Sequence, residues 1–103
     1  MGGIRMEIVK RYEGTKLTIL LNGKLDTESA PVLNAELASS LGGITELVID
    51  MTELSYISSA GLRTLLSAQQ KMNRQGKMTI RGVRDSIMDV FRITGFSALL
   101  TVE

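Results

Sequence analysis

The sequence predicts an α/β fold: a single domain in which a mixed, mostly parallel central sheet of four to five strands has helices packed against it. Its 103 residues fit one domain and hardly two. Apolar residues make up 44% and charged residues 22% of the chain, which is ordinary globular composition. Strand-like and helix-like segments alternate in the order β-β-α-β-α-β-α, with a short final strand predicted after them.

The first half of the chain predicts a hairpin followed by a helix. Residues 6–12 alternate in part between apolar and polar, residues 13–15 form a turn, and residues 16–23 form a second strand. Pro31 then falls where a helix start tolerates its missing N–H. Leucines recur at i, i+4 and i+8 on one face of this helix, which the glycine pair after it ends: Leu33, Leu37 and Leu41.

The middle of the chain predicts a buried strand, a loop and a long helix. Residues 46–51 form a short apolar run, typical of a central strand covered on both faces. Residues 52–59 are predicted to be a loop. From about Ala60 to Gln75 the apolar residues recur at helical spacing, and Gly76 is a natural end for that helix.

The last third predicts a strand, a helix and a short edge strand. Residues 77–81 form the strand. Ser86 and Asp89 have the spacing of a capping box, in which each side chain satisfies a free N–H at the start of a helix. Gly95 ends that helix, and residues 99–102 form the final strand.

Composition excludes several kinds of chemistry. The chain has no Cys and no His, which removes thiol nucleophiles, Ser-His-Asp triads and His or Cys metal sites. The net charge of +1 predicts no direct binding to nucleic acid, and no apolar run reaches the roughly 20 residues that span a bilayer. Carboxylate pairs such as Asp50 and Glu53 have the groups for acid–base catalysis, but no phosphate-binding loop of the Gly-x-x-x-x-Gly-Lys type is present. We therefore expect a cytoplasmic protein that is not an enzyme and needs no cofactor or metal.

The informative segment is Tyr56-Ile57-Ser58-Ser59-Ala60-Gly61-Leu62. It places two serines at the mouth of the long helix, where free N–H groups and a partial positive charge favour an anion. Local physics by itself favours a plain helix cap, because serine is a preferred N-cap residue. Gly61 is unusual in a first turn, and its missing side chain predicts room for another group to approach the serine.

This segment resembles the signature of the STAS-domain family, specifically its anti-sigma factor antagonists. Alignment on Gly61-Leu62 puts the family's phosphate acceptor on Ser59. The upstream Gly23-Lys24-Leu25-Asp26 resembles the family's Gly-x-Leu-Asp loop, and Ala30-Pro31 follows it as in other members. Many members have Asp directly before the acceptor; this chain has Ser58 there, which makes Ser58 a second candidate acceptor.

The resemblance implies a STAS-like fold over residues 6–103, with residues 1–5 as an N-terminal extension. It implies that the unphosphorylated protein binds an anti-sigma factor with serine kinase activity and releases the sigma factor. Phosphorylation of Ser59 then abolishes binding, and a PP2C-type phosphatase restores it. The implied partner-binding residues surround the acceptor: Asp26, Ser58, Ser59, Ala60, Gly61 and Arg63. The alternative is a STAS subunit of a lipid-transport or stress-scaffold complex that is never phosphorylated.

For several residues the sequence allows a purely structural role as well as a functional one. Asp26 either lies beside Ser59 or caps the first helix. Asp50 is better explained as a structural anchor, and Arg63 and Arg74 as a solvated helix face. Three methionines are predicted to fill the core: Met72, Met78 and Met88.

Overall fold

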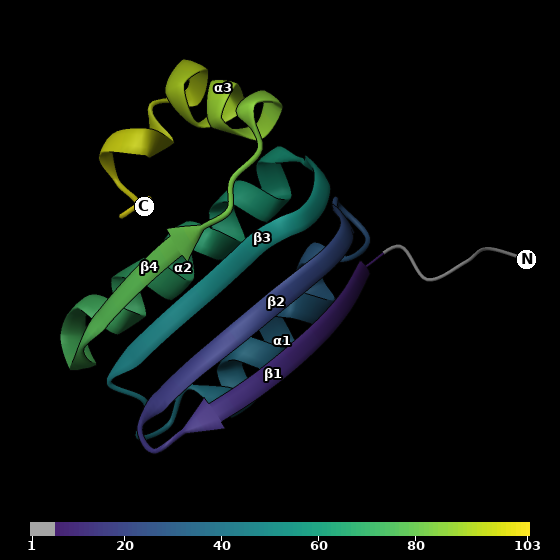
Figure 1. Ribbon diagram of the computed structural model, residues 1–103. Coiled ribbons are helices and arrows are strands. Elements are labelled where there is room, and N and C mark those ends of the chain that lie inside the picture. The colour runs from purple at the N-terminus through teal and green to yellow at the C-terminus, as the bar shows by residue number, and fades with distance from the viewer. Residues whose placement is uncertain (1–5) are drawn as a thin grey trace, which may run out of the picture.

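The computed structural model describes residues 6–103 and shows one four-stranded sheet with helices packed on it (Figure 1). The expected N-terminal extension, residues 1–5, lies outside the described residues. The strands are β1 (Met6–Glu13), β2 (Lys16–Leu25), β3 (Glu46–Ile57) and β4 (Lys77–Arg81). The helices are α1 (Ala30–Ser40), α2 (Ser59–Gln75), α3 (Asp85–Thr94) and the 3₁₀ turn η1 (Phe96–Ala98). The predicted order of elements is confirmed.

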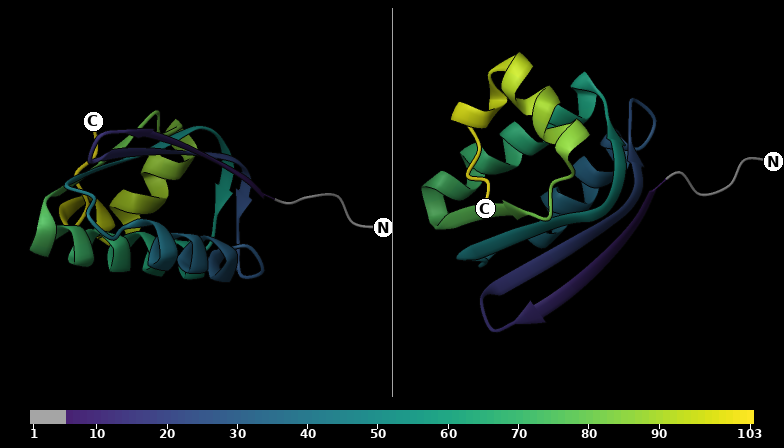
Figure 2. Two further views of the ribbon diagram at one scale, coloured as in Figure 1. Left: turned by 90° about the horizontal axis from the view of Figure 1, so that it is seen from below. Right: turned by 45° about the horizontal axis from the view of Figure 1, so that its top comes forward.

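The sheet has the strand order β1-β2-β3-β4. The predicted hairpin is confirmed: β1 pairs antiparallel with β2, whereas β2–β3 and β3–β4 pair parallel. Each parallel pair is joined by a crossover helix, as parallel strands require. Helices α1 and α2 lie side by side on one face of the sheet, and α3 packs at the end where β3 runs into α2 (Figures 1 and 2).

An aliphatic core fills the space between the sheet and these helices. Leu33 and Leu37 point inward from α1 and Leu41 follows them, which confirms the predicted leucine face. Met72 and Met78 are buried in the same core, and Met88 is partly buried against it. Phe91 is its one fully buried aromatic side chain among the described residues.

Strand β3 is longer than the sequence predicts, and the predicted loop over residues 52–59 is wrong. The strand continues to Ile57, where it still pairs with Leu25 of β2. Register shifts fall between Leu20 and Asn22 and between Gly23 and Lys24 of the partner strand. They break the two-residue alternation, so that Met51, Leu54 and Ile57 are the buried residues in this part of β3. The apolar residues of this part of β3 therefore recur every three positions, and this spacing does not predict a strand.

Three smaller expectations are also corrected. Helix α3 begins at Asp85 behind Arg84, without a side-chain cap, so Ser86 lies inside the first turn and does not form the predicted capping box. The expected final strand over 99–102 is a single parallel bridge between Ile80 and Val102. Strand β3 is central, but α1 and α2 both lie on one face of the sheet (Figure 2). Val48 alternates with the core residues Leu47 and Ile49, so it points to the other face; it is buried but does not belong to the main core.

Candidate functional site

The two serines at the start of α2 have different surroundings. Ser58 is the N-cap: its backbone is extended, and its hydroxyl oxygen accepts the Gly61 N–H at 3.3 Å. Its own N–H donates to the Leu25 carbonyl at 2.9 Å, which ties the start of α2 to the end of β2. Ser59 is the first residue of the helix and is exposed, and within residues 6–103 its hydroxyl makes no hydrogen bond. Ser58 therefore caps the helix, and the hydroxyl of Ser59 is exposed to solvent without a hydrogen bond among the described residues.

Gly61 has a packing role that the sequence reading missed. A Cβ added there would lie 2.7 Å from Leu25 Cγ and 2.9 Å from both the Leu25 carbonyl oxygen and Ile57 Cγ1. The prediction that the missing side chain leaves room for another group to approach the serine is therefore wrong. The missing side chain lets the first turn of α2 lie directly against the ends of β2 and β3, which fixes the position of the neighbouring Ser59.

Asp26 organises the turn between β2 and α1. One oxygen of its carboxylate, Oδ1, accepts the N–H groups of Glu28 and Ser29, both at 3.0 Å. The Ser29 hydroxyl lies 2.7 Å from the Lys24 carbonyl oxygen and 3.1 Å from the same Asp26 oxygen. Because Leu25 pairs with Ile57, this turn and the start of α2 leave the sheet at the same edge. The structural reading of Asp26 accounts for these contacts, and a role toward a partner stays a prediction.

Asp50 is an anchor within the sheet. Its Oδ1 accepts the Thr52 N–H at 3.0 Å and the Thr52 hydroxyl at 2.7 Å, and its Oδ2 lies 3.2 Å from Arg81 Nε on β4. Burial alone would raise the pKa of Asp50, but the Thr52 hydrogen bonds and the Arg81 guanidinium outweigh it and lower the pKa. Both oxygens have partners, which fits the anchor reading better than acid–base work with Glu53.

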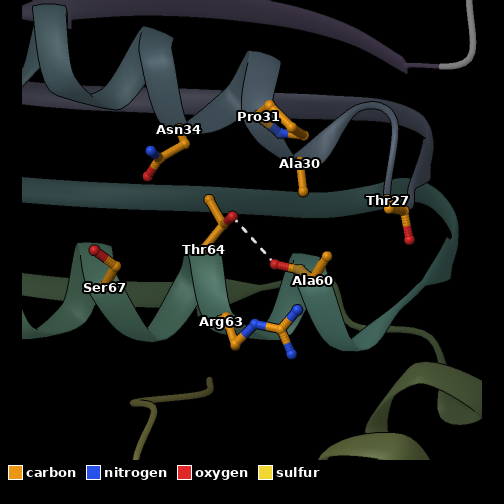
Figure 3. A pocket seen from close by; sticks show the side chains of 8 residues that line it. All are labelled: Thr27, Ala30, Pro31, Asn34, Ala60, Arg63, Thr64 and Ser67. Carbon is orange, nitrogen blue, oxygen red and sulfur yellow. Dashed lines mark hydrogen bonds between the residues drawn. The ribbon is translucent and has the colours of Figure 1, made fainter.

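A groove of about 450 Å³ lies between the N-terminal halves of α1 and α2 (Figure 3). Ala60 and Arg63 line it from α2, and Thr27, Pro31 and Asn34 line it from the turn before α1 and from α1 itself. Ser59 does not line the groove but directly precedes Ala60, which does, so the groove lies close to the start of α2 that carries the exposed hydroxyl. Of the lining residues, the sequence predicts only Ala60 and Arg63 as part of a binding site, because nothing in the sequence shows which two helices lie side by side.

No group of His, Cys, Asp and Glu within residues 6–103 could hold a metal ion. Over the same residues, no helix is both long enough and apolar enough to cross a membrane.

Comparison with known proteins defines the class first. The model of the STAS domain family matches residues 7–103, nearly the whole chain. A solved structure of an anti-sigma factor antagonist from Mycobacterium paratuberculosis superimposes with a TM-score of 0.85 at 16% identity, over 94% of this chain and 84% of that one. SpoIIAA, an anti-sigma factor antagonist, has been solved unphosphorylated and phosphorylated, with TM-scores of 0.73 and 0.72 at 17% identity; the matches cover 95% of this chain and 86% and 90% of the other two.

Relatives with similar sequences show which group within the STAS-domain family this chain resembles. A Bordetella bronchiseptica protein named as an anti-sigma factor antagonist, BtrV, is 38% identical over 84% of this chain and 76% of its own length. The anti-sigma-B factor antagonist of Listeria monocytogenes is 30% identical over 92% of this chain and 85% of its own length. The chain belongs to the anti-sigma factor antagonists of the STAS-domain family, a family of regulators rather than catalysts.

Proposed function

We propose that this protein is a partner switch that is controlled by phosphorylation of Ser59. Unphosphorylated, it binds an anti-sigma factor that is also a serine kinase, and this binding releases the sigma factor. The kinase transfers a phosphoryl group from ATP to the Ser59 oxygen, ADP leaves, and the complex dissociates. A PP2C-type phosphatase hydrolyses the phosphoester and restores the binding form. All three proteins act in the cytoplasm, without direct contact between this chain and nucleic acid or membrane.

The exposed Ser59 hydroxyl is the observation that carries the proposal. It is the first residue of α2, next to a serine whose own hydroxyl is occupied as a cap. Ser59 is therefore preferred over Ser58 as the acceptor. The solved phosphorylated form of SpoIIAA supports the same chemistry in a protein of this fold.

The helix start tolerates the phosphate. Phosphorylation adds about −1.5 to −2 charges at neutral pH. The first turn of α2 contains no acidic residue, and a negative charge at a helix N-terminus is favourable by about 0.3–1 kcal/mol. The fold should thus change little when Ser59 is modified.

The same charge disrupts the complex. At an interface a phosphate is stripped of water and meets the partner's own groups, and like-charge contact costs several kcal/mol. A loss of about 3 kcal/mol weakens binding more than a hundredfold, because each 1.4 kcal/mol is a factor of ten. Local repulsion is sufficient, and the switch needs no large rearrangement.

The test is incubation with the anti-sigma kinase of the same organism and ATP, followed by mass spectrometry and a binding assay. We expect the mass gain of one phosphoryl group on the wild type and on Ser58→Ala, and none on Ser59→Ala. Ser59→Ala should bind the anti-sigma factor constitutively, and Ser59→Asp should bind it more weakly than the wild type.

An unmodified wild-type protein, or full modification of Ser59→Ala, would contradict the proposal. Capture of a transporter ATPase instead of a kinase would favour the alternative, a STAS subunit of a transport complex that is never phosphorylated.

A further inference from the structure

The groove beside Ser59 continues along both helices. Beyond the first hollow of about 450 Å³, a second of about 220 Å³ follows between α1 and α2, and the two share Asn34 and Ser67. Small side chains keep it open where the helices face each other, including Ala30 and Ala60 in the first hollow and Ala38 in the second. Figure 2 shows α1 and α2 side by side on one face of the sheet. The groove between them is open to solvent, because its lining residues Asn34, Ser67 and Lys71 are exposed.

The charged side chains that line this groove are all positive. Arg63 lines the first hollow and Lys71 lines the second, both from α2. Both side chains are exposed, and neither forms an ion pair with any carboxylate of residues 6–103. No Asp or Glu lines either hollow. The groove therefore offers two uncompensated cations on one wall.

The spacing of the cations restricts what can pair with both. They lie eight residues apart on one helix, which is about 12 Å along its axis at 1.5 Å per residue. A helix laid along the groove carries side chains seven or eight residues apart on one face, about two turns, at nearly the same separation. Helices pack side by side at axis distances of about 8–10 Å, so small side chains in a groove favour a helix as its occupant.

We propose that this groove, defined by Arg63, Lys71 and the facing residues of α1, is the docking site for an acidic helix of the anti-sigma factor. Two carboxylates about two turns apart on that helix pair with Arg63 and Lys71. The proposal rests on the proposed function, because it names the chemistry of the partner segment that meets the surface next to Ser59. It adds to that function a contact area on α1, through Pro31 and Asn34.

This docking mode also explains how a phosphate on Ser59 acts beyond repulsion. Ser59 and Arg63 are i and i+4 on α2, the spacing at which helix side chains meet. In Figure 3 the Arg63 guanidinium reaches back toward Ala60, in the first turn. A phosphate on Ser59 therefore competes with the partner's carboxylate for Arg63, and it repels that carboxylate at the same time.

The test measures the affinity of the full-length chain for the anti-sigma factor of the same organism by calorimetry. Arg63→Gln and Lys71→Gln remove the groove charges one at a time and together, and Arg74→Gln removes an equal charge from α2 outside the groove. The double variant should lose about tenfold or more in affinity, as expected for close charge pairs, while Arg74→Gln stays within about twofold. Asn34→Trp should also weaken binding, because it fills the groove from the α1 side.

A second measurement identifies the occupant. A photo-crosslinking residue at position 34, activated in the complex, should capture a peptide of the anti-sigma factor that carries two Asp or Glu residues seven or eight positions apart. Thermal unfolding of each variant checks that the fold is unchanged.

The possible results separate the two proposals. If Ser59→Asp loses binding but the groove variants bind like the wild type, the groove proposal is overturned and the phosphorylation switch stands. A crosslink to a second copy of this chain, or to a peptide without acidic residues, also overturns the groove proposal. If the wild type does not bind the anti-sigma factor at all, both proposals fail.

Discussion

At the scale of single residues, the two adjacent serines at the start of α2 differ in their contacts. The Ser58 hydroxyl accepts a hydrogen bond from the Gly61 N–H, so it contributes to the start of α2. The Ser59 hydroxyl is exposed and makes no hydrogen bond within residues 6–103. A side chain that contributes nothing to stability can be modified or replaced without harm to the fold, which is a useful property in a phosphate acceptor.

This difference predicts that two neighbouring alanine substitutions have unequal effects on stability. Ser58→Ala removes the cap and should lower the free energy of unfolding by about 0.5–2 kcal/mol. Ser59→Ala removes an exposed hydroxyl and should change it by less than about 0.5 kcal/mol. Urea unfolding of both variants measures this, and equal losses would show that the Ser58 cap is not significant.

Asp50 predicts a dependence of stability on pH. Its folded pKa lies below the ordinary value of 3.8, so its contribution is complete above that value and is lost as pH falls through the lower, folded pKa. Asp50→Asn should therefore be less stable than the wild type near neutral pH, and the gap should close in strong acid. Urea unfolding from about pH 7 to about pH 2 measures the gap. Asp89→Asn, at an exposed ion pair on α3, is the control and should show little change; a gap that widens in acid would contradict the assignment.

At the scale of elements, the position of α2 depends on close contact with the sheet. Its first turn packs without a side chain at Gly61 against Leu25 and Ile57, and the Ser58 N–H bonds the Leu25 carbonyl. Those two contacts hold the start of the helix at the edge where β2 and β3 end. These contacts therefore fix the position of Ser59 at the start of α2.

Gly61→Ala should strain this contact. The added Cβ would be 2.7–2.9 Å from three atoms, one of them a backbone oxygen, and overpacking of this kind costs about 1–3 kcal/mol. Gly42→Ala is the matched control, since its Cβ meets nothing within 4 Å; it should be neutral or stabilising by up to about 1 kcal/mol. Thermal unfolding compares the two, and an unchanged Gly61→Ala would mean that α2 can move away freely.

At the scale of the whole molecule, the C-terminal segment closes the sheet at β4. The Ile80 N–H donates to the Thr101 carbonyl at 2.8 Å, and the Glu103 N–H donates to the Ile80 carbonyl at 2.8 Å. Leu100 is 5% exposed and belongs to the core, whereas Leu99 beside it is 54% exposed. These contacts protect the edge of β4 opposite β3.

Leu100→Ala should therefore cost about 2–5 kcal/mol of unfolding free energy, the usual range for a buried leucine. Leu99→Ala should cost less than about 0.5 kcal/mol, because its side chain is mostly in water. Denaturant titration of both variants provides the comparison. Similar midpoints for the two would show that the C-terminal segment is not part of the cooperative fold.

The sequence by itself determined the order of elements, the aliphatic core and the serine pair at the start of α2. These follow from short-range signals: the spacing of apolar residues, the turn glycines and a seven-residue motif. Each signal is contained in a few neighbouring positions, so it survives without knowledge of the rest of the chain.

Only the tertiary structure decided how far β3 extends, which serine hydroxyl is occupied, what Gly61 is for and which helices form a groove. Pairing with β2 continues along β3 as far as Ile57, across two register shifts at which β3 has an extra residue, and the contact of α2 with Leu25 explains Gly61. Arg63 and Asn34 share a groove although they are far apart in the chain. These features depend on pairing between distant segments, and that pairing is fixed only when the whole core is packed.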